Sequence, residues 1–194
     1  AVWTLRPTSH HMSNASRDSA RATQAESPRA AHVRFGARRP KHGDGDVQPY
    51  FVSTRTVRSE KIFVGEVAKI AMRVLREQRD KYRFLLMAFA FMPDHAHFVI
   101  VPAPEHSISQ TMRVIKGSIS RAVNECRGME GAVWQTGFFD KNPRNVEELN
   151  EFIRYTHDNP VAAKLSSRAE DYAYSSADGG CLDDYRRFFD IEQT

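Results

Sequence analysis

The stretch RFLLMAFAFMPDHAHFVIVP, residues 83–102, constrains the fold more than any other part of the chain. It contains two apolar runs of strand length, and only Pro93 and Asp94 separate them. A break of two turn-forming residues between apolar runs is typical of a β-hairpin. We therefore predict two consecutive antiparallel strands joined by a tight turn.

Apolar periodicity predicts further elements on both sides of this hairpin. Residues 50–57, YFVSTRTV, have the β-branched and aromatic character of a strand. Apolar side chains recur with helical spacing over residues 61–79 and again over residues 108–126. An aromatic, strand-like run follows within residues 127–140.

A third helix is expected after the turn-like sequence KNPRN. Asn145 and Glu148 resemble a capping pair at its start, and Pro160 is expected to end it. The predicted order is strand, helix, strand, strand, helix, strand, helix. This order indicates an α+β class, namely a ferredoxin-like split βαβ fold with an antiparallel sheet and helices on one face.

Composition divides the chain into three parts. Residues 1–46 carry 8 Lys/Arg against 4 Asp/Glu and few large apolar groups, which predicts a disordered basic tail or a nucleic-acid-binding arm. Residues 47–177 are expected to form the folded domain. Residues 178–194 read as an acidic tail, and one hypothesis is that this tail folds back as a DNA-mimicking lid.

Charge and apolar content also limit the partners. Residues 47–127 hold 13 basic and 7 acidic side chains, which suits a polyanion. No apolar stretch approaches the roughly 20 residues of a membrane span, so we expect a soluble, cytoplasmic protein without a membrane partner. The two cysteines, Cys126 and Cys181, are far apart and are expected to be reduced.

His95 and His97 are two residues apart in a predicted strand and therefore project from the same face. Two imidazoles on one face can share a divalent cation. The alternative is a pair of half-exposed surface histidines, or one histidine bonded in the core. A site of two histidines is incomplete, so its other ligands would come from another segment and from substrate phosphate oxygens.

The segment RYTHDNPVAAKL, residues 154–165, contains Tyr155 and Asn159 four residues apart. On a helix these two side chains share a face, so a phenol and an amide oxygen would point to one place. A packing tyrosine and a helix-ending Asn-Pro pair are the alternatives. His157 lies off that face and is expected to be structural or to contact phosphate.

Five segments resemble, in order and spacing, those of the REP-associated tyrosine transposases. This family is related to the single-strand insertion-sequence transposases with an HUH motif, which is His, bulky residue, His. The segments lie within residues 48–177 and are MAFAFMPDHAHFVIVP, RVIKGSISRAVN, VWQTGFFDKNPRN, FIRYTHDNPVAAKL and EDYAYSS.

The resemblance implies a role for each residue that matches the motifs. His95 and His97 correspond to the metal ligands, Tyr155 to the nucleophile, and Asn159 to a third, amide-oxygen ligand. By the same resemblance, three residues pack beneath and beside the site: Trp134, Asp140 and Arg144. Departures from the common family pattern at Ala96, Ala162 and Lys164 bear on efficiency and substrate preference.

The implied function is metal-dependent cleavage and rejoining of single-stranded DNA through a covalent 5′-phosphotyrosine, on hairpin or REP-type repeat DNA. Mg²⁺ or Mn²⁺ is the implied ion, because phosphate oxygens must complete its coordination. The protein would be nucleoid-associated when bound to DNA, as a monomer or a homodimer. The residues expected to bind DNA are Arg55, Arg58, Arg113, Lys116, Arg121, Arg144 and Arg154.

The main alternative is a ferredoxin-like module that binds single-stranded nucleic acid without cutting it. In that case the histidines would stack on bases or donate hydrogen bonds. Replication initiators and relaxases with the same HUH chemistry, and a metal-dependent nuclease, are further alternatives.

Overall fold

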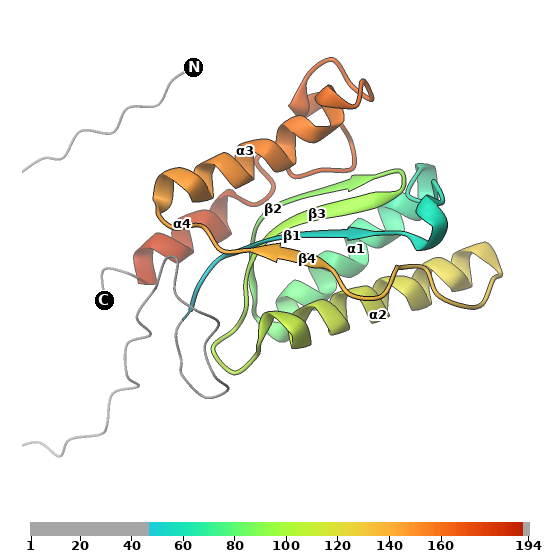
Figure 1. Cartoon of the computed structure of the whole chain (residues 1–194), viewed down its shortest axis with the longest axis horizontal. Helices are drawn as coiled ribbons and strands as arrows, with labels where there is room; N and C mark the ends of the chain where they lie inside the picture. Colours follow the sequence, from blue (N-terminus) through green and yellow to red (C-terminus); the bar gives the residue numbers. More distant parts are fainter. Residues whose placement is uncertain (1–46, 192–194) are drawn as a thin grey trace, which may run out of the picture.

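The computed structural model describes residues 47–191, which form a four-stranded antiparallel sheet with helices on both faces (Figure 1). The sheet order is β2-β3-β1-β4. The strands are β1 (Tyr50–Arg55), β2 (Leu85–Met92), β3 (His95–Val101) and β4 (Phe139–Lys141). The predictions for residues 1–46 and 192–194 lie outside the described residues.

The hairpin that the sequence predicts is present. β2 and β3 pair in antiparallel fashion, with Met92 opposite His95 across the Pro93 and Asp94 turn. β1 lies between β3 and β4 and is antiparallel to both. This order and pairing confirm the predicted α+β, ferredoxin-like arrangement.

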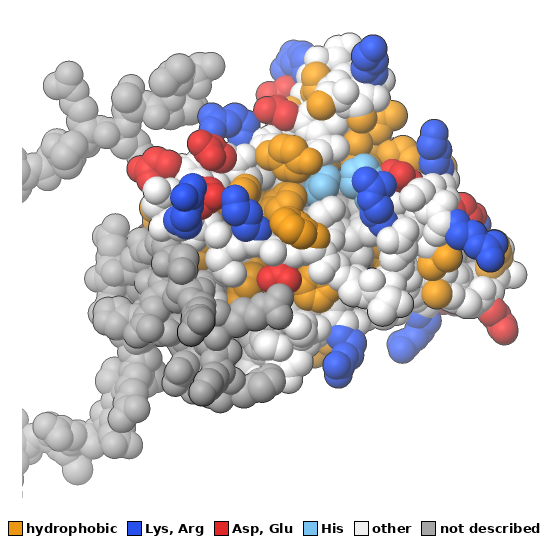
Figure 2. Space-filling model, in the orientation of Figure 1, with side chains coloured by type: hydrophobic (Ala, Val, Ile, Leu, Met, Phe, Trp, Pro, Cys, Tyr) orange, Lys and Arg blue, Asp and Glu red, His pale blue; other side chains and the backbone are white. Residues whose placement is uncertain are grey.

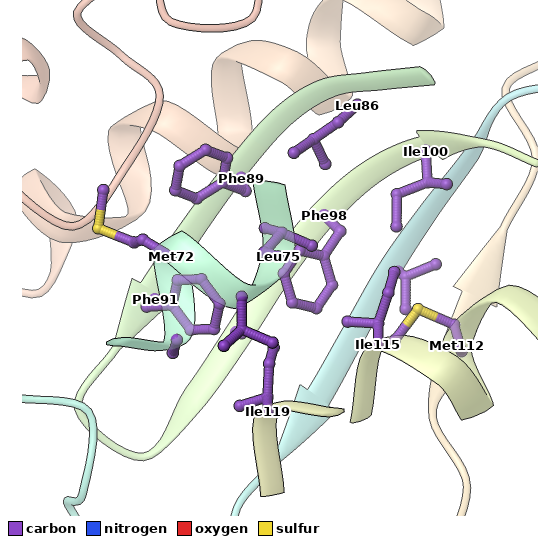
Figure 3. Packing of buried hydrophobic residues seen from close by; sticks show 14 of the residues in the cluster. Met72, Leu75, Leu86, Phe89, Phe91, Phe98, Ile100, Met112, Ile115 and Ile119 are labelled. Atoms are coloured by element: carbon purple, nitrogen blue, oxygen red, sulfur yellow. The ribbon is translucent and has the colours of Figure 1, made fainter. Parts of the chain in front are cut away.

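Two helices cover one face of the sheet, α1 (Gly65–Tyr82) and α2 (Ile108–Arg127). The core between them and the sheet contains fully buried side chains from all of these elements, among them Leu75, Phe91, Phe98 and Ile115 (Figure 3). Ser107 and Gln110 form a capping box that starts α2. Each burial removes a large apolar side chain from water, which is the main stabilisation of this layer.

The opposite face is covered by α3 (Val146–Ala162) and α4 (Leu182–Ile191). The expectation of helices on one face therefore holds for α1 and α2 and needs correction for the C-terminal pair. The physical reason is a second apolar layer on β1 and β3 that includes Phe51 and Val99. Leu149 of α3 and Phe188 of α4, both 0% exposed, bury that layer.

The segment that composition assigns to an acidic tail contributes α4, which packs against β2. Asp184 is 2% exposed and accepts hydrogen bonds from the Arg79 guanidinium and, at 2.8 Å, from the backbone N–H of Leu86. Together with Phe188, these contacts make residues 182–190 part of the domain's packing.

Three predicted boundaries differ from the structure. α1 begins at Gly65 because Val64, the residue before it, has extended backbone angles, and the Phe63 N–H donates to the Pro93 carbonyl at 2.9 Å rather than to a helical carbonyl. The run over residues 127–140 is mostly loop, since glycines with positive φ at Gly131 and Gly137 interrupt it before β4.

α3 does not stop at Pro160 but continues to Ala162. Proline removes one helical N–H donor near the end of the helix. The carbonyls of Asn159 and Pro160 still accept hydrogen bonds from Ala163 and Leu165, so the last turn closes.

Two short 3-10 helices complete the elements of residues 47–191, η1 (Val57–Ser59) after β1 and η2 (Ala169–Asp171) after α3. Among residues 47–191, no helix combines the length and apolar character needed to cross a membrane.

Candidate active site

The strand register brings His95 and His97 to the face of the sheet that α3 covers. In the pairing of β3 with β1, His95 lies opposite Arg55 and His97 lies opposite Ser53. Phe98, the neighbour of His97, is fully buried in the core on the other face. The predicted common face of the two imidazoles is confirmed, and their ring centroids are 4.9 Å apart.

His97 is surrounded by rings and is only 5% exposed. It stacks on Phe51 at a centroid distance of 5.5 Å and meets Tyr155 edge-on, also at 5.5 Å. Burial, reinforced by the nearby charges of His95 and Arg55, lowers the pKa of His97 to about 3. Both ring nitrogens are buried without a hydrogen-bond partner, so the neutral ring has a lone pair available to a cation.

His95 is held by the turn that precedes it. Its Nδ1 lies 2.6 Å from Asp94 Oδ1, and Arg55 Nη1 lies 3.4 Å from Asp94 Oδ2. Burial alone would raise the pKa of Asp94, but the hydrogen bond with His95 and the charges of His95 and Arg55 bring it below its ordinary value. A carboxylate on Nδ1 leaves Nε2 free, which is how histidine ligands of metals are usually oriented.

Sequence reasoning treated Asp94 only as a turn residue. The sequence feature that would have identified this role of Asp94 is a carboxylate directly before a histidine at the start of a strand.

α3 carries Tyr155 to the histidine pair. Asn145 caps the helix by accepting a hydrogen bond from the Glu148 N–H at 2.9 Å, as the sequence predicts. Phe152 packs on Phe51 at 5.3 Å and fixes the helix over β1. Tyr155 lies one turn further along and remains 53% exposed, so its ring contacts the site while the side chain stays open to solvent.

Asn159 is one helical turn beyond Tyr155 in the direction of His95. As α3 advances, its side chains contact first Phe51 and then His97. The same direction along β3 continues to His95. Four residues of helix advance about 6 Å and two residues of strand about 6.8 Å, so Asn159 comes level with His95. Its side chain is half-buried.

The basic residues predicted to contact DNA are divided between the two faces. Arg55 is 54% exposed beside the histidines. Arg144 precedes α3 and Arg154 lies on its exposed side. Arg58 is exposed in η1.

Three of the predicted residues lie elsewhere, because α2 covers the opposite face of the sheet: Arg113, Lys116 and Arg121. Lys116 has a structural role, since its Nζ donates to the carbonyls of Gln135 at 2.8 Å and Gly137 at 2.5 Å. Burial lowers the pKa of Lys116. The structure therefore does not bring this basic face of α2 to the histidine pair.

Three other residues singled out from the sequence support the fold around the site. Trp134 is buried against Phe63 at 4.7 Å, in the core beneath the sheet. Asp140 lies opposite Val52 and so points to that same core face. The Nε2 of His157 lies 2.9 Å from the Ser176 hydroxyl, which indicates a structural contact.

Two residues of β4 that the sequence did not single out lie on the site's face. Phe139 pairs with Ser53 and Lys141 pairs with Phe51. Figure 2 looks on to this face, where histidine side chains lie beside a group of hydrophobic side chains with Lys and Arg on both sides. Alternation along a strand would have predicted the common face of Phe139 and Lys141, but only if the three-residue strand had been identified.

The donor atoms present suit a cation that is completed by substrate. Within the described range 47–191, no three His, Cys, Asp or Glu side chains form a group that could hold a metal ion. The unpartnered nitrogen of His97 and the free Nε2 of His95 are two suitable donors, and Asn159 follows Tyr155 by one turn of α3. Oxygen ligands from DNA phosphate would complete such a site.

Comparison with known proteins assigns the chain to a family. Residues 48–159 match the family described as "Transposase IS200 like". A Haemophilus influenzae protein with the provisional name REP-associated tyrosine transposase is 27% identical over 108 residues. That alignment covers 50% of this chain and 61% of the relative, so the chain spans less than two thirds of it.

A solved structure of a REP-associated tyrosine transposase bound to a REP hairpin has the same fold, with a TM-score of 0.58 at 17% identity. The superposition covers 74% of this chain and 81% of the other.

Proposed function

Because the chain belongs to the IS200-like transposase family, we propose that it cleaves and rejoins single-stranded DNA with Tyr155 as the nucleophile. The proposed substrate is hairpin or REP-type repeat DNA, because the structural neighbour is bound to a REP hairpin and the curated relative is named as REP-associated. Action on such a substrate would place the protein at the nucleoid in the cytoplasm.

The observation that carries the proposal is the meeting of Tyr155 and His97 within one chain. Their rings are in contact at 5.5 Å, although α3 and β3 are separated by more than 40 residues of sequence. A packing tyrosine would be buried, whereas Tyr155 is 53% exposed and its phenol is accessible to a DNA strand. A buried imidazole without a hydrogen-bond partner beside it is unusual unless it binds something.

The proposed reaction exchanges one phosphate ester for another. The Tyr155 Oη, after losing its proton to solvent, forms a bond to phosphorus, and the bond from phosphorus to the 3′-oxygen breaks. The 3′-oxygen takes up a proton, leaving a free 3′-hydroxyl and a 5′-phosphate esterified to Tyr155. Rejoining reverses these steps with a 3′-hydroxyl as attacker, so no nucleotide hydrolysis is required.

His95, His97 and Asn159 are the residues that would hold Mg²⁺ or Mn²⁺. When bound, the ion would neutralise phosphate charge and favour the deprotonated phenol. Asp94 would orient His95, and Phe51 would hold the plane of His97 through its stack. Arg55 lies beside the pair and can contact the DNA backbone, because its guanidinium is more than half exposed.

The test is incubation of the protein with end-labelled hairpin DNA and Mn²⁺, followed by denaturing electrophoresis. We expect a denaturation-resistant protein–DNA adduct that is absent with Tyr155→Phe. Tyr185→Phe, which alters a tyrosine of α4, is the matched control and should form the adduct normally. Binding of the hairpin without any adduct would instead indicate the non-catalytic binding module, and cleavage without an adduct would indicate a metal-dependent nuclease.

A further inference from the structure

Phe139 is an exposed aromatic side chain on the face that carries the histidine pair. It belongs to the three-residue edge strand β4 and is 60% exposed. Its neighbour Phe138 points the other way and packs against the main core. The ring of Phe139 therefore has little part in holding the fold together, although exposing it to water is unfavourable.

The sheet register places Phe139 in one row with the site. Phe139 lies opposite Ser53 on β1, and Ser53 lies opposite His97 on β3. Two strand spacings of about 4.8 Å put Phe139 roughly 10 Å from His97 across the sheet. Serine is small, so no bulky side chain of that row separates the ring from the imidazole.

The ring is also tied to the site through one aromatic neighbour. Phe139 meets Phe51 edge-on at 6.5 Å, with an interplanar angle of 67°. Phe51 in turn stacks on His97 and contacts Tyr155. An edge-on contact with a single ring leaves the other surface of Phe139 free to stack with a planar group.

Cationic side chains lie on both sides of this ring. Lys141 follows on the same face of β4 and contacts the Phe152 ring at 5.0 Å, while Arg55 lies toward the other end of the site. In the free protein Lys141 is paired with Glu148, and Arg55 with Asp94. An aromatic platform between cations suits one occupant, an unpaired nucleobase whose flanking phosphates meet those cations.

We propose that Phe139 is the stacking platform for an unpaired base next to the phosphate at Tyr155, an inference that rests on the proposed action on single-stranded DNA. Stacking is tolerant of base identity, so Phe139 adds affinity and fixes the strand's position without reading its sequence.

The test compares two single strands of equal charge, dT15 and a 15-nucleotide abasic strand, by fluorescence anisotropy. The protein carries Tyr155→Phe, so that binding is measured without chemistry. We expect dT15 to bind more tightly than the abasic strand, and Phe139→Ala to weaken dT15 binding by about 5- to 150-fold while leaving abasic binding unchanged. Phe139→Trp should restore the preference for dT15, because the indole supplies an equivalent stacking face.

Leu182→Ala is the matched control, since Leu182 is a 54% exposed apolar side chain on α4, beyond the other edge of the site. Far-UV circular dichroism should show the same melting curve for all variants. The inference is overturned if Phe139→Ala binds dT15 as the parent does, if it weakens both strands equally, or if the parent binds both strands alike.

Failure here is distinguishable from failure of the proposed function. Adduct formation by the chain with native Tyr155 tests the chemistry and does not require Phe139. If the adduct forms and Phe139→Ala does not change dT15 binding, only the stacking role of Phe139 is refuted. If Phe139→Ala weakens dT15 binding selectively but no adduct forms, Phe139 still stacks on a base and the protein is a binding module.

Discussion

The hydrogen bond between Asp94 and His95 determines which imidazole nitrogen of His95 is left free beside His97. At 2.6 Å it occupies Nδ1, and Arg55 holds the far oxygen of the carboxylate at 3.4 Å. Under the proposed function Asp94 is thus a positioning residue, because it contacts the proposed ligand His95 and not the reacting atoms. His97 needs no such partner, since Phe51 and Tyr155 hold its ring by contact.

Removing that carboxylate should weaken metal binding. We expect Asp94→Ala to reduce Mn²⁺ affinity by about 10- to 100-fold, measured by electron paramagnetic resonance in the Tyr155→Phe protein with hairpin DNA. Asp94→Asn keeps a hydrogen-bond acceptor and should fall between Asp94→Ala and the parent. Asp183→Ala removes a carboxylate that is 88% exposed on α4 and should leave affinity unchanged. Equal affinity for Asp94→Ala and the parent would show that the turn does not orient His95.

At the scale of elements, the site depends on how α3 begins. Glu148 lies in the first turn with a side chain only 7% exposed, and it accepts hydrogen bonds from Lys141 Nζ at 2.8 Å and from the Arg144 backbone N–H at 2.7 Å. The link joins β4 to α3. It therefore fixes Phe139 and Tyr155, which these two elements carry, relative to each other.

This link predicts an acid-sensitive stability. Hydrogen bonds from Lys141 first, and then from Arg144, lower the pKa of Glu148 to about 2 from 4.5. A depressed carboxyl pKa stabilises the fold fully above the unfolded value, and that contribution is lost as pH falls from about 4.5 toward 2. Glu148→Gln should therefore lower Tm at pH 7, and its deficit relative to the parent should shrink below about pH 4.5.

Thermal unfolding followed from pH 7 to pH 3 measures this difference. Glu147→Gln is the matched control, because Glu147 is in the same first turn but exposed. A Tm deficit for Glu148→Gln that stays constant from pH 7 to pH 3 would mean that ionisation of Glu148 does not contribute to the stability of the fold.

At the scale of the whole molecule, β3 with the turn before it, β1, β4 and α3 of one chain contribute the side chains of the candidate site. α4 packs against β2 in the same apolar layer as α3, where Phe188 is fully buried, and its Asp184 accepts a hydrogen bond from Arg79. The hydrogen bond with Asp184 raises the pKa of Arg79, so the guanidinium of Arg79 stays charged.

A site assembled within one chain should not be rebuilt by mixing defective chains. We expect a 1:1 mixture of Tyr155→Phe and His95→Ala proteins to form no adduct with labelled hairpin DNA, because each chain lacks one half of its own site. Each variant mixed with parent protein should show the parent's adduct, which controls for inhibition. Restored adduct in the mixture would show that α3 is exchanged between subunits of a homodimer, and that the site is not assembled within one chain.

The sequence by itself determined the elements that carry the site. Strand alternation put His95 and His97 on one face, helical spacing aligned Tyr155 with Asn159, and the Pro93 and Asp94 turn fixed the hairpin. These are properties of neighbours along the chain, where the repeat of the backbone alone decides which side chains share a face. The order of the elements was enough to predict the ferredoxin-like sheet.

What only the tertiary structure decided is how distant segments meet. The contact of Tyr155 with His97, the position of Phe139 two strands away, and the place of α4 on β2 depend on the sheet order and on which face α3 buries. The basic face of α2 was readable from the sequence, but whether it lay with the histidines was not. A periodic pattern shows that a face exists, whereas the packing of the second apolar layer, including Phe51 and Val99, decides what covers it.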